Sequence, residues 1–328
     1  MKSMLRRSRL TAVAASAMLA LASCGGGEIE EQTREAEERA GEAGDCGELN
    51  MAVNPWVGYE ASAYVVGQVA ETELGCRVNY KKLKEDVSWQ GFGTGEVDVV
   101  IEDWGHPDLE NKFFEGSGDG SAMDFGPNGN VGIIGWYVPA WLVEEHPDIL
   151  DWENLNKYAD EFATSESGGQ GQFLGSDPSY VQFDEAIISN LGLDYKVVFS
   201  GGEAATITAY QQAQRNRTPL IGYFWEPQYI HAEIPMEKVA LPPYEEGCQD
   251  VPAQVACDYP ETPLKKIVST EWAESDSSAV DLVQNFEWTN EDQNLVAKYI
   301  TADGMSPEDA AAKWVEDNPD KVEAWLGS

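Results

Sequence analysis

Histidine, positive charge and long apolar runs are all scarce in this sequence, and each scarcity excludes a class of function. Only three of the 328 residues are histidines, and no Ser/His/Asp, Cys/His or His-Glu-x-x-His arrangement occurs. The sequence lacks the usual nucleophile, base and metal ligands of an enzyme, so we expect no catalysis, cofactor or metal. Lysine and arginine number 21 against 58 aspartates and glutamates, for a formal net charge of −37. Because such a chain repels phosphates, we expect neither nucleic acid nor an anionic lipid surface as a partner.

The one marked apolar run lies near the N-terminus. Four basic residues precede apolar residues 10–22, and Leu21-Ala22-Ser23-Cys24 closes the run. A basic start, a short apolar core and small residues before a cut site indicate a secretory signal peptide over residues 1–23. Cys24 in this setting resembles the bacterial lipoprotein box, which implies that Cys24 is lipidated and becomes the first mature residue. The alternative is an ordinary signal peptide followed by an incidental cysteine.

Residues 24–45 contain almost nothing apolar and many glutamates. Such a segment cannot bury a core, so we expect an acidic tether that is disordered or a solvated helix. No later segment is long and apolar enough to span a bilayer. We therefore expect an exported protein, soluble but anchored by its lipid to the outer face of the cytoplasmic membrane, on the periplasmic side if an outer membrane exists.

Cysteine is also rare, and the pattern fits export. Besides Cys24, the sequence has Cys46, Cys76, Cys248 and Cys257. An even number outside the cytosol suggests disulfides. Cys46 and Cys76 each precede an expected strand, so they meet at one edge if the strands are parallel neighbours, and the other two flank a proline-containing loop. We favour the pairs Cys46–Cys76 and Cys248–Cys257 over the two other pairings.

From residue 46 on, expected strands alternate with expected helices. The first strands are residues 48–54, 77–83 and 97–102, with a helix at 60–73 between the first two, which predicts a parallel sheet with right-handed crossovers. Residues 115–130 are read as a loop, residues 131–138 as a strand, and Pro139 as the crossing into a second lobe. There we expect helices at 153–162, 184–191 and 203–216 and strands at 171–175, 195–199 and 219–224. The lobes are residues 46–138 plus 240–328 and residues 139–239, with helices ending the chain.

Three tryptophans lie where a core tryptophan would be unusual. Trp56, Trp104 and Trp225 each follow a short apolar run and are followed by proline or glycine within three residues. We expect these indoles on the loops at the carboxyl ends of strands, where ligands bind in open α/β sheets. Flat π-faces with few positive charges nearby suit a cation without hydrogen-bond donors, such as a quaternary ammonium group. We assign to packing the tryptophans on helices or apolar faces: Trp141, Trp152, Trp272, Trp288, Trp314 and Trp325.

Five short segments, taken in order, resemble one family. They are Asn54-Pro55-Trp56-Val57-Gly58, residues 95–107 with Asp103-Trp104 and Pro107, Gly135-Trp136-Tyr137-Val138-Pro139, Pro178-Ser179-Tyr180, and Trp225-Glu226-Pro227. The resemblance is to the glycine betaine-, choline- and proline betaine-binding proteins of ABC uptake transporters, over residues 48–326. It implies a two-lobed, periplasmic-binding-protein-like clamshell of type II. Each lobe would be a mainly parallel sheet flanked by helices.

The resemblance also implies a binding site. Trp104 and Trp225 would form an aromatic cage, joined by Trp56, Tyr180 and Tyr137. Closure of the lobes over the ligand would create the form that a permease recognises.

For a ligand with a carboxylate, the resemblance implies that the main-chain N–H groups of Val57 and Gly58 hold that carboxylate. Two positions depart from relatives. Gln228 stands where some members place a histidine that holds the carboxylate, and Gly58 stands where some choline-binding members carry an aspartate. The second departure argues against choline as the sole ligand.

We therefore expect a monomeric solute receptor that captures a quaternary ammonium compound and delivers it to an ABC permease. One alternative is a receptor for another small ligand, such as choline, carnitine, an amino-acid derivative or a polyamine. The other is an exported carbohydrate-active enzyme, with tryptophans as sugar platforms and Asp103 and Glu226 as paired carboxylates.

Overall fold

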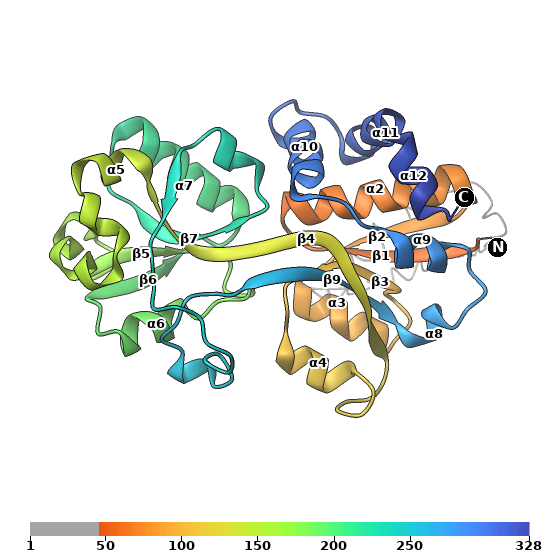
Figure 1. Ribbon diagram of the computed structural model, residues 1–328, viewed down its shortest axis with the longest axis horizontal. Helices are drawn as coiled ribbons and strands as arrows, with labels where there is room; N and C mark the ends of the chain where they lie inside the picture. Colours follow the sequence, from red (N-terminus) through yellow and green to blue (C-terminus); the bar gives the residue numbers. More distant parts are fainter. Residues whose placement is uncertain (1–45, 328) are drawn as a thin grey trace, which may run out of the picture. The chain divides into compact units, whose positions relative to one another are not determined.

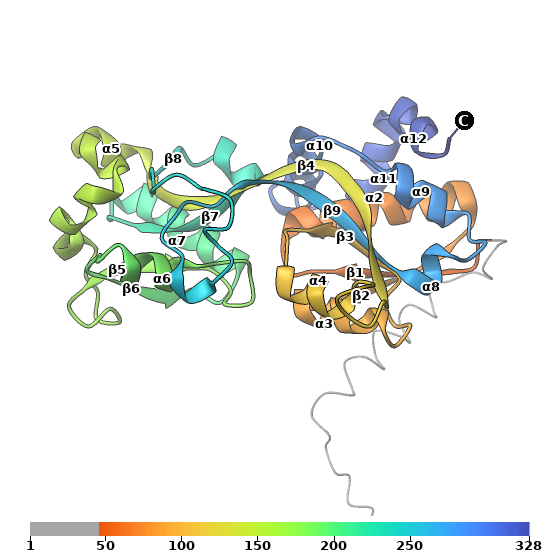
Figure 2. The ribbon, with the colours of Figure 1, turned by 60° about the horizontal axis from the view of Figure 1, so that its bottom comes forward.

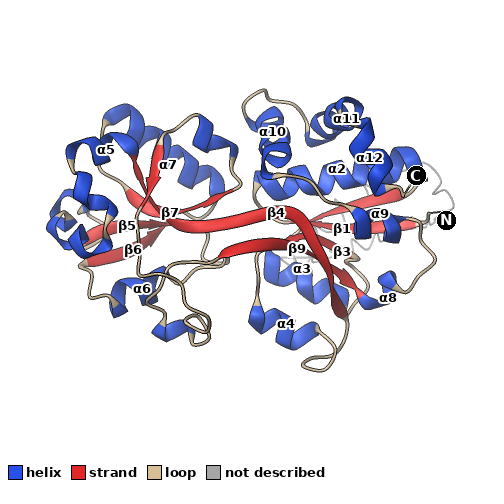
Figure 3. Ribbon diagram, in the orientation of Figure 1, coloured by secondary structure: helices blue, strands red, loops and turns tan. Residues whose placement is uncertain are grey.

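The computed structural model describes residues 46–327 of the chain. The predicted signal peptide (residues 1–23), the acidic tether (residues 24–45) and the lipidation site Cys24 lie outside these residues. The described residues form an α/β fold in which one mixed sheet is flanked by helices (Figure 3). The fold class is the predicted one, and its parallel strands lie at the two ends of the sheet.

The first lobe contains one of the two ends of the sheet at which the strands are parallel. Its strands are β1 (Glu48–Val53), β2 (Arg77–Lys82) and β3 (Val99–Asp103), and β1 pairs in parallel with both others. The helices that follow these strands are α2 (Val57–Leu74), α3 (Glu85–Phe92) and α4 (Pro107–Phe113). Since β1 and β3 are parallel neighbours, the residues that follow them emerge at the same edge of the sheet.

The second lobe contains the other parallel end. Its strands are β5 (Gly171–Gly175), β6 (Tyr195–Phe199) and β7 (Ile221–Glu226), and its helices are α5 (Ala140–Glu145), α6 (Asp184–Asn190) and α7 (Glu203–Asn216). Short 3-10 turns cover Pro147–Leu150, Tyr229–Ala232 and Pro252–Gln254.

The predicted helix over residues 153–162 is wrong. The chain there forms two 3-10 turns, Trp152–Lys157 and Ala159–Phe162, separated by Tyr158 at φ −108° and ψ 0°. The exposed Asn156 side chain bonds the main chain at residues 192 and 194, and these bonds hold the first turn against the neighbouring segment in place of a regular helix.

Two long strands connect the lobes. β4 (Ala122–Pro139) pairs with β9 (Glu261–Ser269) along its first part and with β7 along its second, and both pairings are antiparallel. Figures 1 and 2 show β4 and β9 running from one lobe to the other. The end of β4 also pairs with β8 (Met236–Lys238). The lobe boundary at residues 138 and 139 stays a prediction, since the sheet continues through it. The full strand order is β2-β1-β3-β9-β4-β7-β5-β6.

Residues 115–130 are not a simple loop, because β4 begins at Ala122. The sequence misleads since Gly126 and Gly129 both have positive φ, and the register against β9 shifts in this stretch. A Cβ on Gly129 would lie 2.2 Å from the Trp288 carbonyl oxygen. The glycine therefore serves a close approach between two backbones within a strand.

Five C-terminal helices return to the first lobe: α8 (Thr270–Ala273), α9 (Ala279–Asn285), α10 (Asn290–Thr301), α11 (Pro307–Asp317) and α12 (Pro319–Trp325). Helices α10 and α11 pack on α2, opposite the strands (Figure 1). This double cover explains why α2 is apolar on most of its surface. Within residues 46–327, none of the helices combines the length and apolar character that a membrane crossing needs.

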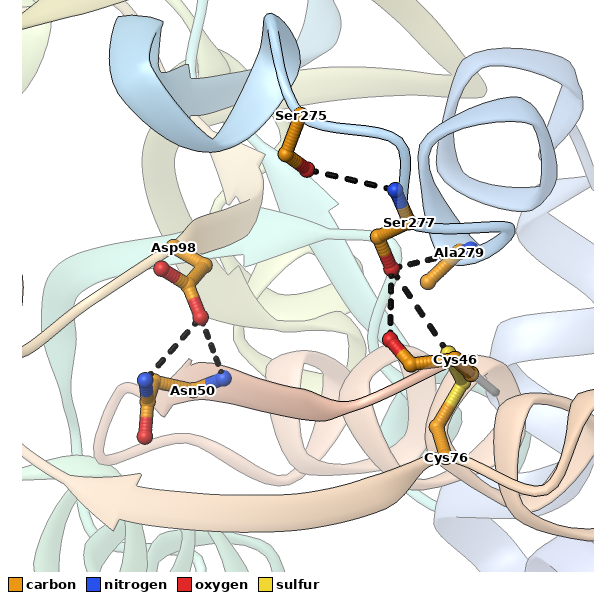
Figure 4. Close-up of a disulfide and its surroundings, with 7 residues drawn as sticks. All are labelled: Cys46, Asn50, Cys76, Asp98, Ser275, Ser277 and Ala279. Atoms are coloured by element: carbon orange, nitrogen blue, oxygen red, sulfur yellow. Dashed lines mark hydrogen bonds between the residues drawn. A yellow bond between two sulfur atoms is a disulfide. The ribbon is translucent and has the colours of Figure 1, made fainter. Parts of the chain in front are cut away.

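The structure contains both favoured disulfides. Cys46–Cys76 joins the starts of β1 and β2, with 4.8 Å between the Cα atoms, and Cys248–Cys257 closes a surface loop. Figure 4 shows Ser277 beside the first bond. The Ser277 hydroxyl donates to the Cys46 carbonyl at 3.0 Å, which ties the segment before α9 to the cross-linked strand ends.

Candidate functional site

One cavity gathers side chains from both lobes. It encloses about 280 Å³ of empty space, part of it open to solvent. Because this figure includes space that is open to solvent, the enclosed room is smaller, and the cavity suits only a small solute. The lining residues are Trp56, Glu85, Trp104, Ile134, Tyr180, Val181, Tyr223 and Trp225.

The strand ends of the first lobe place two of the indoles. Trp104 follows β3 directly, and Trp56 caps the N-terminus of α2, three residues beyond β1. Their closeness follows from the parallel pairing of β1 and β3. β4 passes tightly behind Trp104, because a Cβ on Gly132 would lie 2.6 Å from that ring. Gly132 thus lets the strand connecting the lobes pack against the cavity wall.

The second lobe supplies the facing rings. Trp225 lies within β7, paired with Ile134 of β4, so its predicted place on a loop is wrong, because the strand runs two residues past the predicted end at residue 224. Tyr180 lies in the turn before α6, and its ring meets Trp56 and Trp225 edge to face, with centroids 5.4 and 5.7 Å away. The Tyr180 hydroxyl donates to the Pro55 carbonyl at 3.0 Å. Tyr180 therefore bridges the two lobes at the cavity.

A buried carboxylate fixes the two indoles of the first lobe. Glu102, fully buried in β3, accepts hydrogen bonds from the indole N–H of Trp56 at 2.8 Å and of Trp104 at 2.9 Å, both on Oε1. Its Oε2 accepts from Ser62 and Gln293. Burial raises the pKa of Glu102, while these four hydrogen bonds lower it. One buried carboxylate therefore fixes the orientation of two lining indoles.

A second acidic group borders the cavity. Glu85 lines it at the start of α3, and the His106 imidazole lies 2.7 Å from the Glu85 carboxylate. Burial lowers the pKa of His106, but Glu85 and Asp103 outweigh this effect and raise it to about 9. Burial raises the pKa of the neighbouring Asp103 to about 7.

Glu85, Asp103 and His106 lie close enough together to hold a metal ion. With His106 protonated at neutral pH, however, the cluster is an ion pair beside a carboxyl group. This wall of the cavity is therefore neutral when Asp103 is protonated and negative when Asp103 is ionised.

The cavity therefore combines aromatic faces with negative charge. Its lining residues include no lysine or arginine. A cation that cannot donate hydrogen bonds gains from the ring faces without needing a directional partner. The arrangement suits capture of a methylated ammonium group.

Four of the five predicted cage residues line this one cavity, namely Trp56, Trp104, Tyr180 and Trp225. Tyr137 does not line it. Its ring packs against Phe224 and His231, and its hydroxyl lies 3.4 Å from Glu226. Contact of the four with a ligand stays a prediction.

Two of the groups expected to hold a ligand carboxylate, the Val57 N–H and the Gln228 side chain, are already engaged. The Val57 N–H donates to Glu203 Oε2 at 2.9 Å, and Gln228 Nε2 donates to Glu203 Oε1 at 2.6 Å. At Gly58 the carbonyl accepts from Ser62, and a Cβ there would lie 2.3 Å from the Gln293 side chain. None of the three residues lines the cavity.

Sequence reasoning missed four lining residues. Tyr223 was open to prediction, because alternation along β7 puts it on the same face as Trp225. Glu85, Ile134 and Val181 carry no comparable signal, since only the tertiary fold brings them to the strand ends. The bond from Glu102 to Trp56 joins residues 46 positions apart, so it too depends on the tertiary fold.

Comparisons with known proteins identify the family. Residues 47–317 match the family model described as the substrate binding domain of an ABC-type glycine betaine transport system. A trimethylamine N-oxide-binding protein of Pelagibacter ubique is 24% identical over 271 residues, which cover 80% of this chain and 85% of that protein.

Two solved structures share the fold. One is an ABC-transporter choline-binding protein in complex with choline, with a TM-score of 0.69 and 21% identity, covering 86% of this chain and 92% of that one. The other is lactococcal OpuAC in its closed-liganded conformation with glycine betaine, with a TM-score of 0.64 and 21% identity, covering 85% and 99%. Because the family model spans most of the sequence, the chain belongs to the substrate-binding domains of ABC-type glycine betaine transport systems.

Proposed function

We propose that this protein captures a small quaternary ammonium compound, of the glycine betaine kind, in its aromatic cavity and delivers it to the permease of an ABC importer. The observation that carries the proposal is the convergence of three indoles and two phenol rings from both lobes on one small cavity. Family membership supports the transport role. The choline, glycine betaine and trimethylamine N-oxide named for similar proteins all carry a methylated nitrogen.

The expected affinity follows from the ring faces. Each aromatic face contributes roughly 0.5–2 kcal/mol to holding a cation, and more where water is excluded. Several faces together give several kcal/mol before ordering costs, which suits reversible capture. Because the rings come from both lobes, ligand binding and lobe closure favour each other.

The proposed location rests on the sequence. The signal peptide and Cys24 support an exported, lipid-anchored receptor, a monomer held at the outer face of the cytoplasmic membrane. An importer needs its receptor on that side.

Other ligands on the same scaffold are the main alternative. Glu85 in the cavity wall favours ligands that also offer an N–H or O–H donor, such as choline or a polyamine. The enzyme alternative has less support, since neither Asp103 nor Glu226 is among the lining residues.

Calorimetry tests the proposal. Purified protein is titrated with glycine betaine, proline betaine, choline, carnitine, tetramethylammonium and spermidine, and the Trp104→Ala and Trp225→Ala variants are compared with Trp152→Ala, which removes an indole outside the cavity. We expect at least one quaternary compound to bind, the two cavity variants to lose tight binding, and the control to retain it. Binding of spermidine alone, or unchanged affinity in both cavity variants, would contradict the proposal.

A further inference from the structure

The anion position at the start of α2 is filled by the protein itself. The first turn of a helix presents unpaired N–H groups that attract an anion. Here the Val57 N–H points at Glu203 of α7, and the Gln228 amide binds the other oxygen of the same carboxyl group. Val57 belongs to the first lobe, whereas Glu203 and Gln228 belong to the second.

The contact has the features of a built site. Gln228 is 3% exposed, and its own oxygen accepts from the Ile230 N–H, which fixes the direction of its amide. Glu203 is the first residue of α7, directly after Gly202 at φ 152°, a backbone conformation that favours glycine. Glycine at position 202 therefore permits the backbone conformation from which α7 begins with Glu203.

Electrostatics oppose a second carboxylate at this place. The pKa of Glu203 is raised to about 8, mainly by burial and also by the carboxyl groups of Glu60 and Glu102, against the lowering effect of the bonds from Val57 and Gln228. Like charges that share a site disfavour each other's ionised form. A ligand carboxylate would need either to join this acidic group or to displace Glu203 and leave it without its donors.

We propose that Glu203 is a specificity-determining residue that occupies the position of a ligand carboxylate, so that the protein selects methylated ammonium compounds lacking a carboxylate over betaines. This inference rests on the proposed function in its broader form, capture of a quaternary ammonium compound, and it replaces glycine betaine as the preferred ligand. Val57 directly follows Trp56, a lining residue, so the position that Glu203 fills lies beside the cavity. The aromatic cavity supplies affinity for the methylated nitrogen, and Glu203 rejects the betaine tail. Rejection through a position already filled is a common route to specificity.

Calorimetric titrations with tetramethylammonium, choline and glycine betaine test the inference on four proteins: wild type, Glu203→Ala, Glu203→Gln and Glu60→Ala. The readout is the ratio of the glycine betaine affinity to the tetramethylammonium affinity, which cancels changes common to both ligands. In the wild type we expect this ratio to be about one-tenth or lower. Glu203→Ala frees both donors, and we expect the ratio to rise about tenfold or more.

The other two variants distinguish the effect of filling the position from the effect of negative charge near it. Glutamine fills the same volume and keeps an oxygen for the Val57 N–H, so Glu203→Gln should raise the ratio far less than Glu203→Ala. Glu60→Ala removes a nearby negative charge that faces Lys82 at 3.4 Å, without vacating the position, and should leave the ratio near the wild-type value. Circular dichroism and the urea midpoint check that each variant is folded.

Three outcomes overturn the inference. One is a wild-type ratio of one or more, another is an unchanged ratio in Glu203→Ala, and the third is a rise in Glu203→Gln equal to that in Glu203→Ala. Tetramethylammonium and choline keep the test separate from the proposed function. If tetramethylammonium and choline bind but the affinity ratios differ from those expected, only the role of Glu203 is contradicted. If the wild type binds none of the three compounds, the proposed function is contradicted as well.

Discussion

Two clusters of tryptophan in this molecule use the same side chain in opposite ways. In the first, Trp56, Trp104 and Trp225 surround the cavity. In the second, which we call the C-terminal cluster, Trp288, Trp314 and Trp325 pack on one another: Trp314 stacks on Trp325 at 5.6 Å and meets Trp288 edge to face at 5.5 Å. All six rings are buried, so burial alone does not distinguish a binding site from a core.

The partners of the indole N–H groups mark the difference. Around the cavity, one buried carboxylate, Glu102, holds two indoles from behind. In the C-terminal cluster, Trp288 donates to Asn130 and Trp325 to a main-chain carbonyl, while the Trp314 N–H has no acceptor among the described residues. A buried carboxylate thus orients two of the three cavity indoles, whereas in the C-terminal cluster the rings pack on one another and Lys321 lies over the Trp314 ring at 5.5 Å.

The largest effect should come from the C-terminal cluster. Trp314→Ala removes a ring with 1% exposure and leaves a void between two others, so we expect the free energy of unfolding to fall by about 3–5 kcal/mol. Urea unfolding measures this loss. Ligand affinity of the folded fraction should equal that of the wild type, and a large change in affinity would erase the distinction between the clusters.

Trp225→Ala should show the reverse pattern. Loss of a desolvated ring face weakens cation binding by about 2 kcal/mol or more, close to thirtyfold. Calorimetry with tetramethylammonium measures the change, because this probe has no tail that could bind elsewhere. An affinity loss smaller than that of Trp314→Ala would show that the two clusters do not divide their roles in this way.

Glu102→Gln tests the anchor with little change of shape. The amide oxygen can still accept from the indoles, but the Gln293 amide and the Ser62 hydroxyl would face an amide NH2, and the negative charge behind the rings is lost. Since hydrogen bonds to a charged group contribute about 1.5–3 kcal/mol, we expect roughly tenfold weaker binding of tetramethylammonium. Gln293→Ala, which removes one donor and keeps the charge, is the matched control and should cost less affinity. Equal losses would assign the effect to packing.

The tryptophans of the cavity were easier to predict from the sequence than the residues that hold the cavity together. Trp56, Trp104 and Trp225 were predictable because apolar runs that end at proline or glycine indicate strand ends, and parallel strands bring those ends together. Glu203 was not predictable, because its bond to Val57 spans 146 positions and depends on how the two lobes meet. Residues 122–130 were misread since their glycines permit bulges and a close backbone approach, and such glycines resemble those of a loop.

The smallest effect should appear in the pH dependence of tetramethylammonium binding to the cavity. Asp103, with its pKa near 7, gains a negative charge as the pH rises from 6 to 8, while His106, with its pKa near 9, stays protonated over most of that range. Affinity for a permanent cation should therefore grow severalfold, since charges near a partly buried site interact through a reduced dielectric.

The Glu203 carboxyl titrates near pH 8 and adds to the upper part of this rise in affinity. Titration with tetramethylammonium at several pH values should show the increase, and Asp103→Asn should flatten its lower part. Between pH 6 and 8 the unfolding free energy of Trp314→Ala should follow the same pH curve as the wild type, because the charge described over the Trp314 ring is Lys321, and the pKa of its partner Asp292 is held below the usual value, so the pair stays ionised in this range. A different curve would mean that titrating charge stabilises both clusters.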